Sequence, residues 1–243
     1  MEPSNTYCKN CETLVKANYC GQCGQRATVH KVTFKETFTD LIASLFTFEA
    51  PFTRTLYMLM SNPGKMFRDY LEGKRKNYFK PVSFFILLTV VHILTRSLLN
   101  YNPINDTSFP NFPGAEAFKE AAEFMVRNIN NILFVLVFTL SVFMKLFFFK
   151  RYSWAEYMAV AFYMAGVYIL VGTLNLFLMK FLDSSIQFLS MVIMLFYFVY
   201  AMISFLTKHK ILVAIGSVIA YVLGMFCYAV LGYLISFIIV SIR

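Results

Sequence analysis

The longest apolar stretch of the chain, residues 211–242, reads ILVAIGSVIAYVLGMFCYAVLGYLISFIIVSI and contains no charged residue. A helix needs about 20 apolar residues to cross the roughly 30 Å of hydrocarbon in a bilayer. A charge-free run of this length therefore predicts a transmembrane helix. Because the run exceeds one crossing, we expect the helix to tilt or to end in the interface.

Four further apolar stretches precede this one and approach or exceed the length of one crossing. They cover residues 82–99, 131–149, 157–182 and 186–206. The chain is 58% hydrophobic and only 14% charged, with 28 phenylalanines among 243 residues, which is far more apolar than a soluble domain. The sequence therefore predicts an all-α integral membrane bundle of about five transmembrane helices over residues 81–243.

Basic residues between the apolar stretches indicate an orientation, because Lys and Arg accumulate on the cytoplasmic side during insertion. They cluster before the first stretch at residues 74–80, between the second and third at residues 150–151, and between the fourth and fifth at residues 208–210. The N-terminal residues show no secretory signal. We therefore expect a multipass protein of the bacterial inner membrane, with a cytoplasmic N-terminus and a periplasmic C-terminus.

Four of the five cysteines form two CxxC pairs near the N-terminus, Cys8-Lys9-Asn10-Cys11 and Cys20-Gly21-Gln22-Cys23. In a reducing cytoplasm, metal binding explains paired cysteines better than disulfides do. Four thiolates can close a tetrahedral shell around Zn²⁺, which leaves no open position for a substrate. We predict that residues 1–30 form a zinc-ribbon module with structural Zn²⁺ bound by Cys8, Cys11, Cys20 and Cys23. Iron in the same site and a redox dithiol remain as alternatives.

Residues 31–80 are expected to form amphipathic helices at the membrane interface. Apolar residues recur at helical spacing from Phe34 to Phe46, and two shorter segments follow, one from Pro51 to Met60 and one from Lys65 to Glu72. Asn62-Pro63-Gly64 separates the two shorter segments and Gly73 ends the second. Such helices lie on a membrane surface or cover the end of a bundle.

A basic segment follows these helices, with Lys74, Arg75, Lys76 and Lys80 next to Tyr78 and Phe79. One interpretation is a plain topology signal. The other is contact with lipid headgroups, since several cations beside a membrane attract anionic phospholipid. Nucleic acid is not an expected partner, because Glu2 and Glu12 interrupt the basic face of the cysteine module.

His92 and Arg96 are the candidate polar site within the membrane. They are four residues apart in the first apolar stretch, so they share one face of a helix. Ionisable residues at membrane depth often mark functional sites. Arg96 has a simpler interpretation as a side chain that extends toward the headgroups.

Four segments of the N-terminal third resemble a known family. They are residues 19–25 (YCGQCGQ), 53–56 (TRTL), 62–65 (NPGK) and 70–81 (YLEGKRKNYFKP). On these segments the chain resembles the bacterial membrane proteins grouped as domain of unknown function 3667. The resemblance implies a zinc-ribbon head on a multipass bundle and supplies no activity.

Three functions are compatible with these features. A non-enzymatic adaptor or regulator, whose zinc head recruits a cytoplasmic protein, uses all the strong features. A transporter or lipid-handling protein is the first alternative; a homo-oligomer would supply the symmetry that five spans lack. A membrane enzyme acting on a lipid headgroup is the second, but the sequence offers no catalytic motif, so we expect no enzyme activity.

Overall fold

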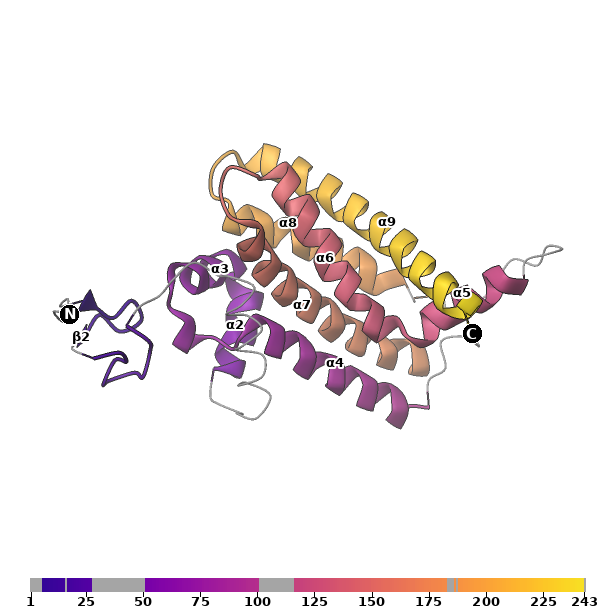
Figure 1. The fold of residues 1–243 in the computed structure, drawn as a ribbon, viewed down its shortest axis with the longest axis horizontal. Helices are drawn as coiled ribbons and strands as arrows, with labels where there is room; N and C mark the ends of the chain where they lie inside the picture. The colour runs from indigo at the N-terminus through magenta and orange to yellow at the C-terminus, as the bar shows by residue number, and fades with distance from the viewer. Residues whose placement is uncertain are drawn as a thin grey trace.

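The computed structural model is predominantly helical, with a small N-terminal head and a bundle of long helices (Figure 1). It describes residues 6–15, 17–27, 51–100, 116–182, 186 and 188–242. The amphipathic helix expected between Phe34 and Phe46 lies outside the described residues.

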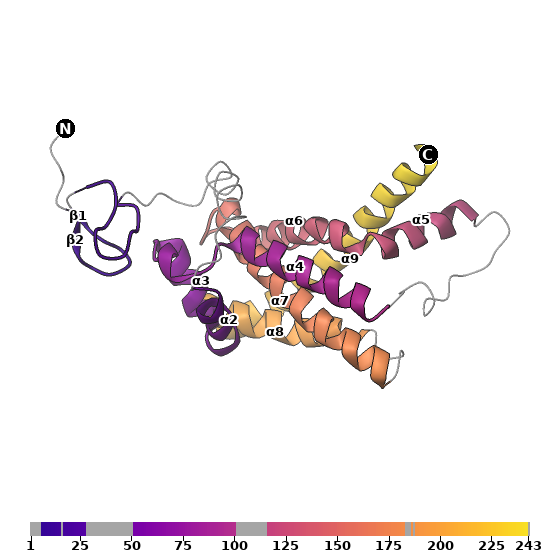
Figure 2. The ribbon, with the colours of Figure 1, turned by 90° about the horizontal axis from the view of Figure 1, so that it is seen from below.

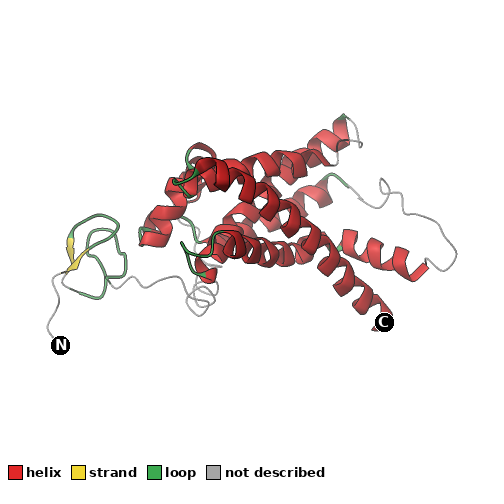
Figure 3. Cartoon of the chain, turned by 90° about the horizontal axis from the view of Figure 1, so that it is seen from above, coloured by secondary structure: helices red, strands yellow, loops and turns green. Residues whose placement is uncertain are grey.

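The head contains a short antiparallel hairpin made of β1 (Thr6–Tyr7) and β2 (Leu14–Val15), in which Tyr7 pairs with Leu14. A single bridge between Tyr19 and Arg26 follows it. Figure 3 shows the two strands set apart from the helices at one end of the molecule.

Two short helices and a 3-10 turn connect the head to the bundle. They are α2 (Phe52–Ser61), α3 (Pro63–Glu72) and η1 (Arg75–Asn77), and Figure 2 shows them between the head and the long helices. The side chain of Asn62 caps α3 by accepting a hydrogen bond of 3.1 Å from the Lys65 amide, and Pro63 occupies the first turn. Gly73 ends α3 in a left-handed conformation with φ of 113°.

The bundle contains α4 (Pro81–Leu98), α6 (Ile129–Phe147), α7 (Trp154–Phe181), α8 (Leu189–Phe205) and α9 (Lys210–Ile242). Helix α7 packs against α4, α6 and α8, while α9 packs against α6 and α8. The short helix α5 (Glu116–Arg127) packs against α9 near the C-terminal end. These helices follow the five predicted apolar stretches to within three residues at each end.

The core of the bundle is centred on Tyr163 of α7, which is only 1% exposed. Its ring stacks on Phe67 of α3 with 6.1 Å between centroids, and its hydroxyl donates a hydrogen bond of 2.5 Å to the carbonyl oxygen of Phe79. A buried tyrosine needs such a partner for its hydroxyl. The short helices are therefore part of the same core as the long ones.

Within the described residues, three helical segments are long and apolar enough to cross a membrane: Arg75–Leu98, Trp154–Phe181 and Lys210–Ile242. A fourth crossing is counted if Lys119–Arg127 and Ile132–Phe147, which meet at a bend of 88°, form one span. Helix α8 is apolar but has only 17 residues. The structure therefore supports three to four candidate spans, and the fifth crossing is not confirmed.

Candidate metal centre and its attachment to the helices

The two CxxC pairs of the head have the same backbone hydrogen bonds. The Cys8 amide donates to the carbonyl of Thr13 at 2.9 Å, and the Glu12 amide donates back to the carbonyl of Cys8 at 2.8 Å. The second pair repeats this pattern. The Cys20 amide donates to the carbonyl of Gln25 at 2.7 Å, and the Gly24 amide donates back to the carbonyl of Cys20 at 2.8 Å. The head therefore consists of two equivalent knuckles.

Each knuckle turns at a residue with a left-handed backbone. This residue is Glu12 in the first knuckle, with φ of 61°, and Gly24 in the second, with φ of 69°. A glycine adopts this conformation without strain, whereas a glutamate does so at some cost. The turn directs both cysteines of a pair toward the same point.

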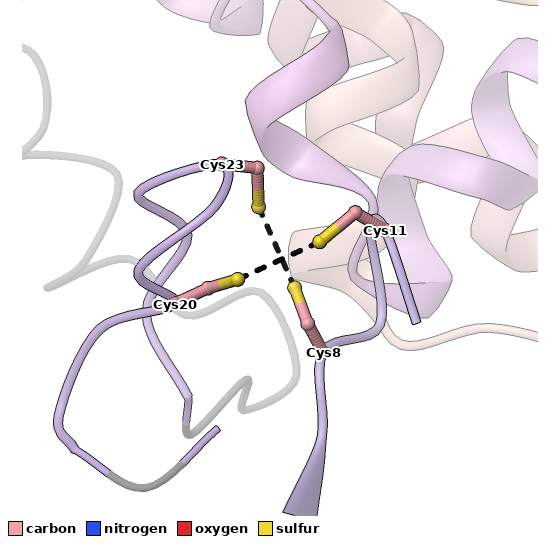
Figure 4. A group of neighbouring side chains, drawn as sticks. All are labelled: Cys8, Cys11, Cys20 and Cys23. Atoms are coloured by element: carbon pink, nitrogen blue, oxygen red, sulfur yellow. Dashed lines mark hydrogen bonds between the residues drawn. The ribbon is translucent and has the colours of Figure 1, made fainter. Parts of the chain in front are cut away.

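All four sulfur atoms meet at this point, as Figure 4 shows. The Sγ atoms lie within 4.8 Å of one another, with 3.6 Å between Cys8 and Cys23 and 3.5 Å between Cys11 and Cys20. A disulfide would bring two sulfurs to about 2.05 Å, so none is formed here. A tetrahedron with Zn–S bonds of about 2.3 Å has S–S edges of roughly 3.8 Å, which fits this cluster. The predicted ligand set is therefore brought together, and it can hold a metal ion.

The surroundings of the sulfurs divide the cysteines into two classes. Cys8 and Cys20 are 3% exposed, whereas Cys11 and Cys23 are partly exposed.

The two partly exposed thiols differ in pKa. The hydrogen bond with the Thr13 side chain lowers the pKa of the Cys11 thiol to about 6. Burial raises the pKa of the Cys23 thiol to about 12. A bound cation stabilises thiolates, so it would ionise the whole set.

Gln25 attaches the second knuckle to the helices. Its side chain is only 6% exposed. The Nε2 amide donates to the carbonyl oxygen of Gly73, and Oε1 accepts a hydrogen bond of 3.2 Å from the Lys76 amide. Its own carbonyl accepts from Cys20, so one residue connects the metal ligands to the segment between α3 and α4.

The other end of α3 is joined to the C-terminus of α8. The Gly64 amide donates to Ser204 Oγ at 3.2 Å, and Ser204 Oγ donates to Asn62 Oδ1 at 3.1 Å. Arg68 Nη1 donates to the carbonyl oxygens of Ser204 at 2.6 Å and Phe205 at 3.0 Å. These carbonyls have no partner within the helix, so the arginine acts as a cap for α8.

Gly64 is required at this joint for reasons of space. A Cβ at position 64 would overlap the backbone of Ser204 and Phe205. Tyr197 and Tyr200 of α8 add hydrogen bonds to the carbonyls of Leu59 and Ser61, at 3.1 and 2.8 Å. The Asn-Pro-Gly turn, which is predicted from sequence as a break between two segments, is also a contact point for α8.

Residues 49–93, which contain the α2 and α3 side of this joint and the Gln25 contact surface, match the family model described as "Protein of unknown function (DUF3667)". The chain carries a DUF3667 segment. The predicted family is thereby confirmed, and the matched range runs from α2 to the middle of α4 without the cysteines. No curated protein and no solved structure matches the chain.

Within the DUF3667 segment, all four cations predicted to meet lipid headgroups have partners in the protein. Lys74 Nζ lies 3.1 Å from Asp69 Oδ1, and Asp69 Oδ2 accepts a hydrogen bond of 3.0 Å from the hydroxyl of Tyr78. The Arg75 guanidinium lies 5.8 Å from the centroid of the Tyr70 ring. Lys76 contacts Gln25 through its backbone, and Lys80 directly precedes α4. Binding of lipid by the four side chains stays a prediction.

His92 lies near the end of the DUF3667 segment and contacts α7. Its Nδ1 atom is 2.8 Å from Thr173 Oγ1, and the Thr173 hydroxyl donates to the Ile169 carbonyl at 2.7 Å. Since the hydroxyl proton is already used, the histidine must be the donor, which assigns its proton to Nδ1. Arg96 lies one turn further along α4. A functional role for the His92 and Arg96 pair stays a prediction.

Proposed function

We propose that the chain is a non-enzymatic membrane adaptor whose metal-bound head recruits a cytoplasmic protein partner. The observation that carries this proposal is the closed cluster of four sulfurs. Four protein ligands fill a tetrahedral shell and leave no position for a substrate or an activated water. Such a site contributes folding energy to a small head and performs no chemistry.

The surface of the head supports recruitment of a protein. Tyr7 is 68% exposed, Tyr19 is 58% exposed and Leu14, opposite Tyr7 in the hairpin, is 39% exposed. Tyrosines are common at the centres of protein interfaces because they bury a large ring and keep a polar tip. The Gln25 contacts hold this surface at a defined place beside the helices.

The proposal includes the finer features expected from the sequence. The metal is Zn²⁺, because a closed shell of four cysteines in a small module is typical of structural zinc. The protein crosses the bacterial inner membrane five times, with α8 as a short crossing of 17 residues. The basic connections then face the cytoplasm, together with the head, and the C-terminus faces the periplasm.

A photo-crosslinking amino acid at position 14 tests the adaptor function in cells. We expect one defined protein adduct, which disappears in the Cys20→Ser variant and weakens in Tyr19→Ser. Tyr57→Ser is the matched control, because Tyr57 is 69% exposed but belongs to α2. An adduct that survives Cys20→Ser, or no adduct from the wild-type head, would contradict the proposal.

Lipid handling is the second candidate function. It is favoured by the polar contact between His92 and Thr173, which lies between two of the candidate spans. If this function is correct, His92→Ala will abolish the cellular phenotype while the head variants retain it. The adaptor function predicts the opposite pattern.

A further inference from the structure

A cavity of about 300 Å³ lies between the connection from α6 to α7 and the start of α9. Figure 1 shows that this connection and the one from α8 to α9 reach the same end of the bundle. The volume is at the lower end of the roughly 300–1,000 Å³ of typical ligand pockets. This cavity is separate from the cysteine cluster and from the His92 contact.

The walls of the cavity are apolar and its edge is basic. Phe148, Leu212 and Val213 contribute apolar surface, and Leu212 is 68% exposed. Lys150, Arg151 and Lys208 are all exposed and line the same cavity. Among the described residues that line it there is no carboxylate, so nothing in the lining neutralises the three cations.

The connection that carries two of these cations has a fixed shape. Lys145 Nζ donates to the carbonyls of Phe149 and Tyr152 at 2.7 and 2.8 Å, and the hydroxyl of Tyr157 donates to the Phe148 carbonyl at 2.8 Å. A neighbouring carboxylate, Glu156, already accepts a hydrogen bond of 2.7 Å from the Ser153 amide through its Oε2 atom. The cavity is therefore formed before any ligand arrives, which lowers the entropy cost of binding.

The ring of Phe148 packs against Gly216 of α9. A Cβ at that position would lie 3.2 Å from Cζ of Phe148. The contact places an aromatic wall opposite Leu212 and Val213, at the end of two candidate spans. An apolar wall at the end of membrane-spanning helices is a surface that acyl chains can reach.

We propose that this cavity binds one anionic phospholipid. Its phosphate contacts Lys150, Arg151 and Lys208, and the upper part of an acyl chain lies on Phe148, Leu212 and Val213. Charge complementarity selects an anionic headgroup, and the apolar walls distinguish a lipid from a free phosphate. Basic connections also arise from the topology rule alone, but that rule requires neither a cavity nor a bound molecule. The proposal is independent of the adaptor function.

Native mass spectrometry of the full-length protein tests the site in mixed micelles with phosphatidylglycerol or phosphatidylcholine. We expect one retained phosphatidylglycerol per chain, with an affinity at least about tenfold above that for phosphatidylcholine. Glycerol 3-phosphate, which lacks the acyl chains, should not be retained. Equal retention of the two lipids, or retention of glycerol 3-phosphate, would overturn the proposal without any variant.

The combined variant Lys150→Gln/Arg151→Gln/Lys208→Gln should lose this preference, and the single variant Lys208→Gln should weaken it. The charge-matched control is Lys65→Gln/Lys119→Gln/Lys180→Gln, which removes three exposed cations outside the cavity. The control should keep the bound lipid. If the control loses the lipid as readily as the cavity variant, or both keep it, the cavity is not the binding site.

Discussion

The side-chain oxygen of Gln25 accepts a hydrogen bond from the backbone amide of Lys76, 51 residues further along the chain. The amide nitrogen of the same side chain donates to the carbonyl of Gly73. Gln25 thus satisfies two backbone groups where α3 ends and η1 begins. A buried glutamine with both ends paired in this way fixes the position of the head more strictly than apolar contact would.

Replacing Gln25 with alanine should release the head from the helices. A hydrogen bond contributes about 0.5–1.5 kcal/mol, so the Lys76 amide should exchange its hydrogen roughly tenfold faster in the Gln25→Ala variant. Hydrogen exchange followed by mass spectrometry measures this directly. Gln22→Ala is the matched control, because Gln22 accepts a hydrogen bond from Thr13 within the head. Unchanged exchange at Lys76 in Gln25→Ala would show that the contact does not form.

The purified protein should contain one zinc ion per chain, and Cys20→Ser should lose it. A structural zinc site contributes about 10–16 kcal/mol to the folding of a small module, so a strong chelator should also unfold the head. Elemental analysis gives the stoichiometry, and proteolysis reports the unfolding. Cys227→Ser serves as the control, since Cys227 lies in α9 outside the cluster. If the preparation contains iron instead of zinc, the assignment of the metal as zinc is wrong. A preparation free of metal would refute the metal site itself.

Gly64→Ala should destabilise the joint between α3 and α8. Overpacking costs about 1–3 kcal/mol when a methyl group has no space, and here it meets backbone atoms that cannot move aside. We expect a lower Tm in detergent. Gly172→Ala is the matched control, because a Cβ at this helical position has no neighbour within 4 Å. It should leave the Tm unchanged or raise it slightly. Equal effects of the two substitutions would argue against the close approach.

Arg68→Gln should remove the cap from α8. A hydrogen bond from a charged donor contributes about 1.5–3 kcal/mol, and two partly buried carbonyl groups would lose their partner. Thermal unfolding and limited proteolysis after α8 measure the loss. Arg54→Gln provides the comparison, because Arg54 is exposed and lies over the Tyr78 ring at 5.7 Å, a contact worth about 0.5–1 kcal/mol. A larger effect at Arg54 than at Arg68 would contradict this account.

Local patterns predicted the parts of this molecule that depend on neighbouring residues. The charge-free run 211–242 corresponds to α9, and the CxxC spacing identified the four sulfurs that cluster. The turn at Asn62-Pro63-Gly64 and the stop at Gly73 were also recognised, because proline and glycine act on their own backbone. In these cases a residue determines structure within a few positions of itself in the sequence, so the local pattern is enough to predict it.

Contacts between distant residues could not be predicted in the same way. Gln25 has an ordinary polar side chain, and nothing in its spacing indicates Gly73 or Lys76 as partners. Ser204 and Arg68 are 136 positions apart. The fifth crossing is not confirmed, because α8 begins only at Leu189 and its 17 residues are fewer than the roughly 20 of a typical crossing.

The joint between Arg68 and Ser204 also determines the order in which the protein can be completed during translation. At about 5–20 residues per second, a separation of 136 residues corresponds to roughly 7–27 s between synthesis of the two partners. During that interval Met66 and Phe67, which are fully buried in the finished protein, have no helix α8 to cover them. The nascent DUF3667 segment cannot complete this joint until α8 has been synthesised, so its docking onto α8 is a late event in folding rather than an early nucleus.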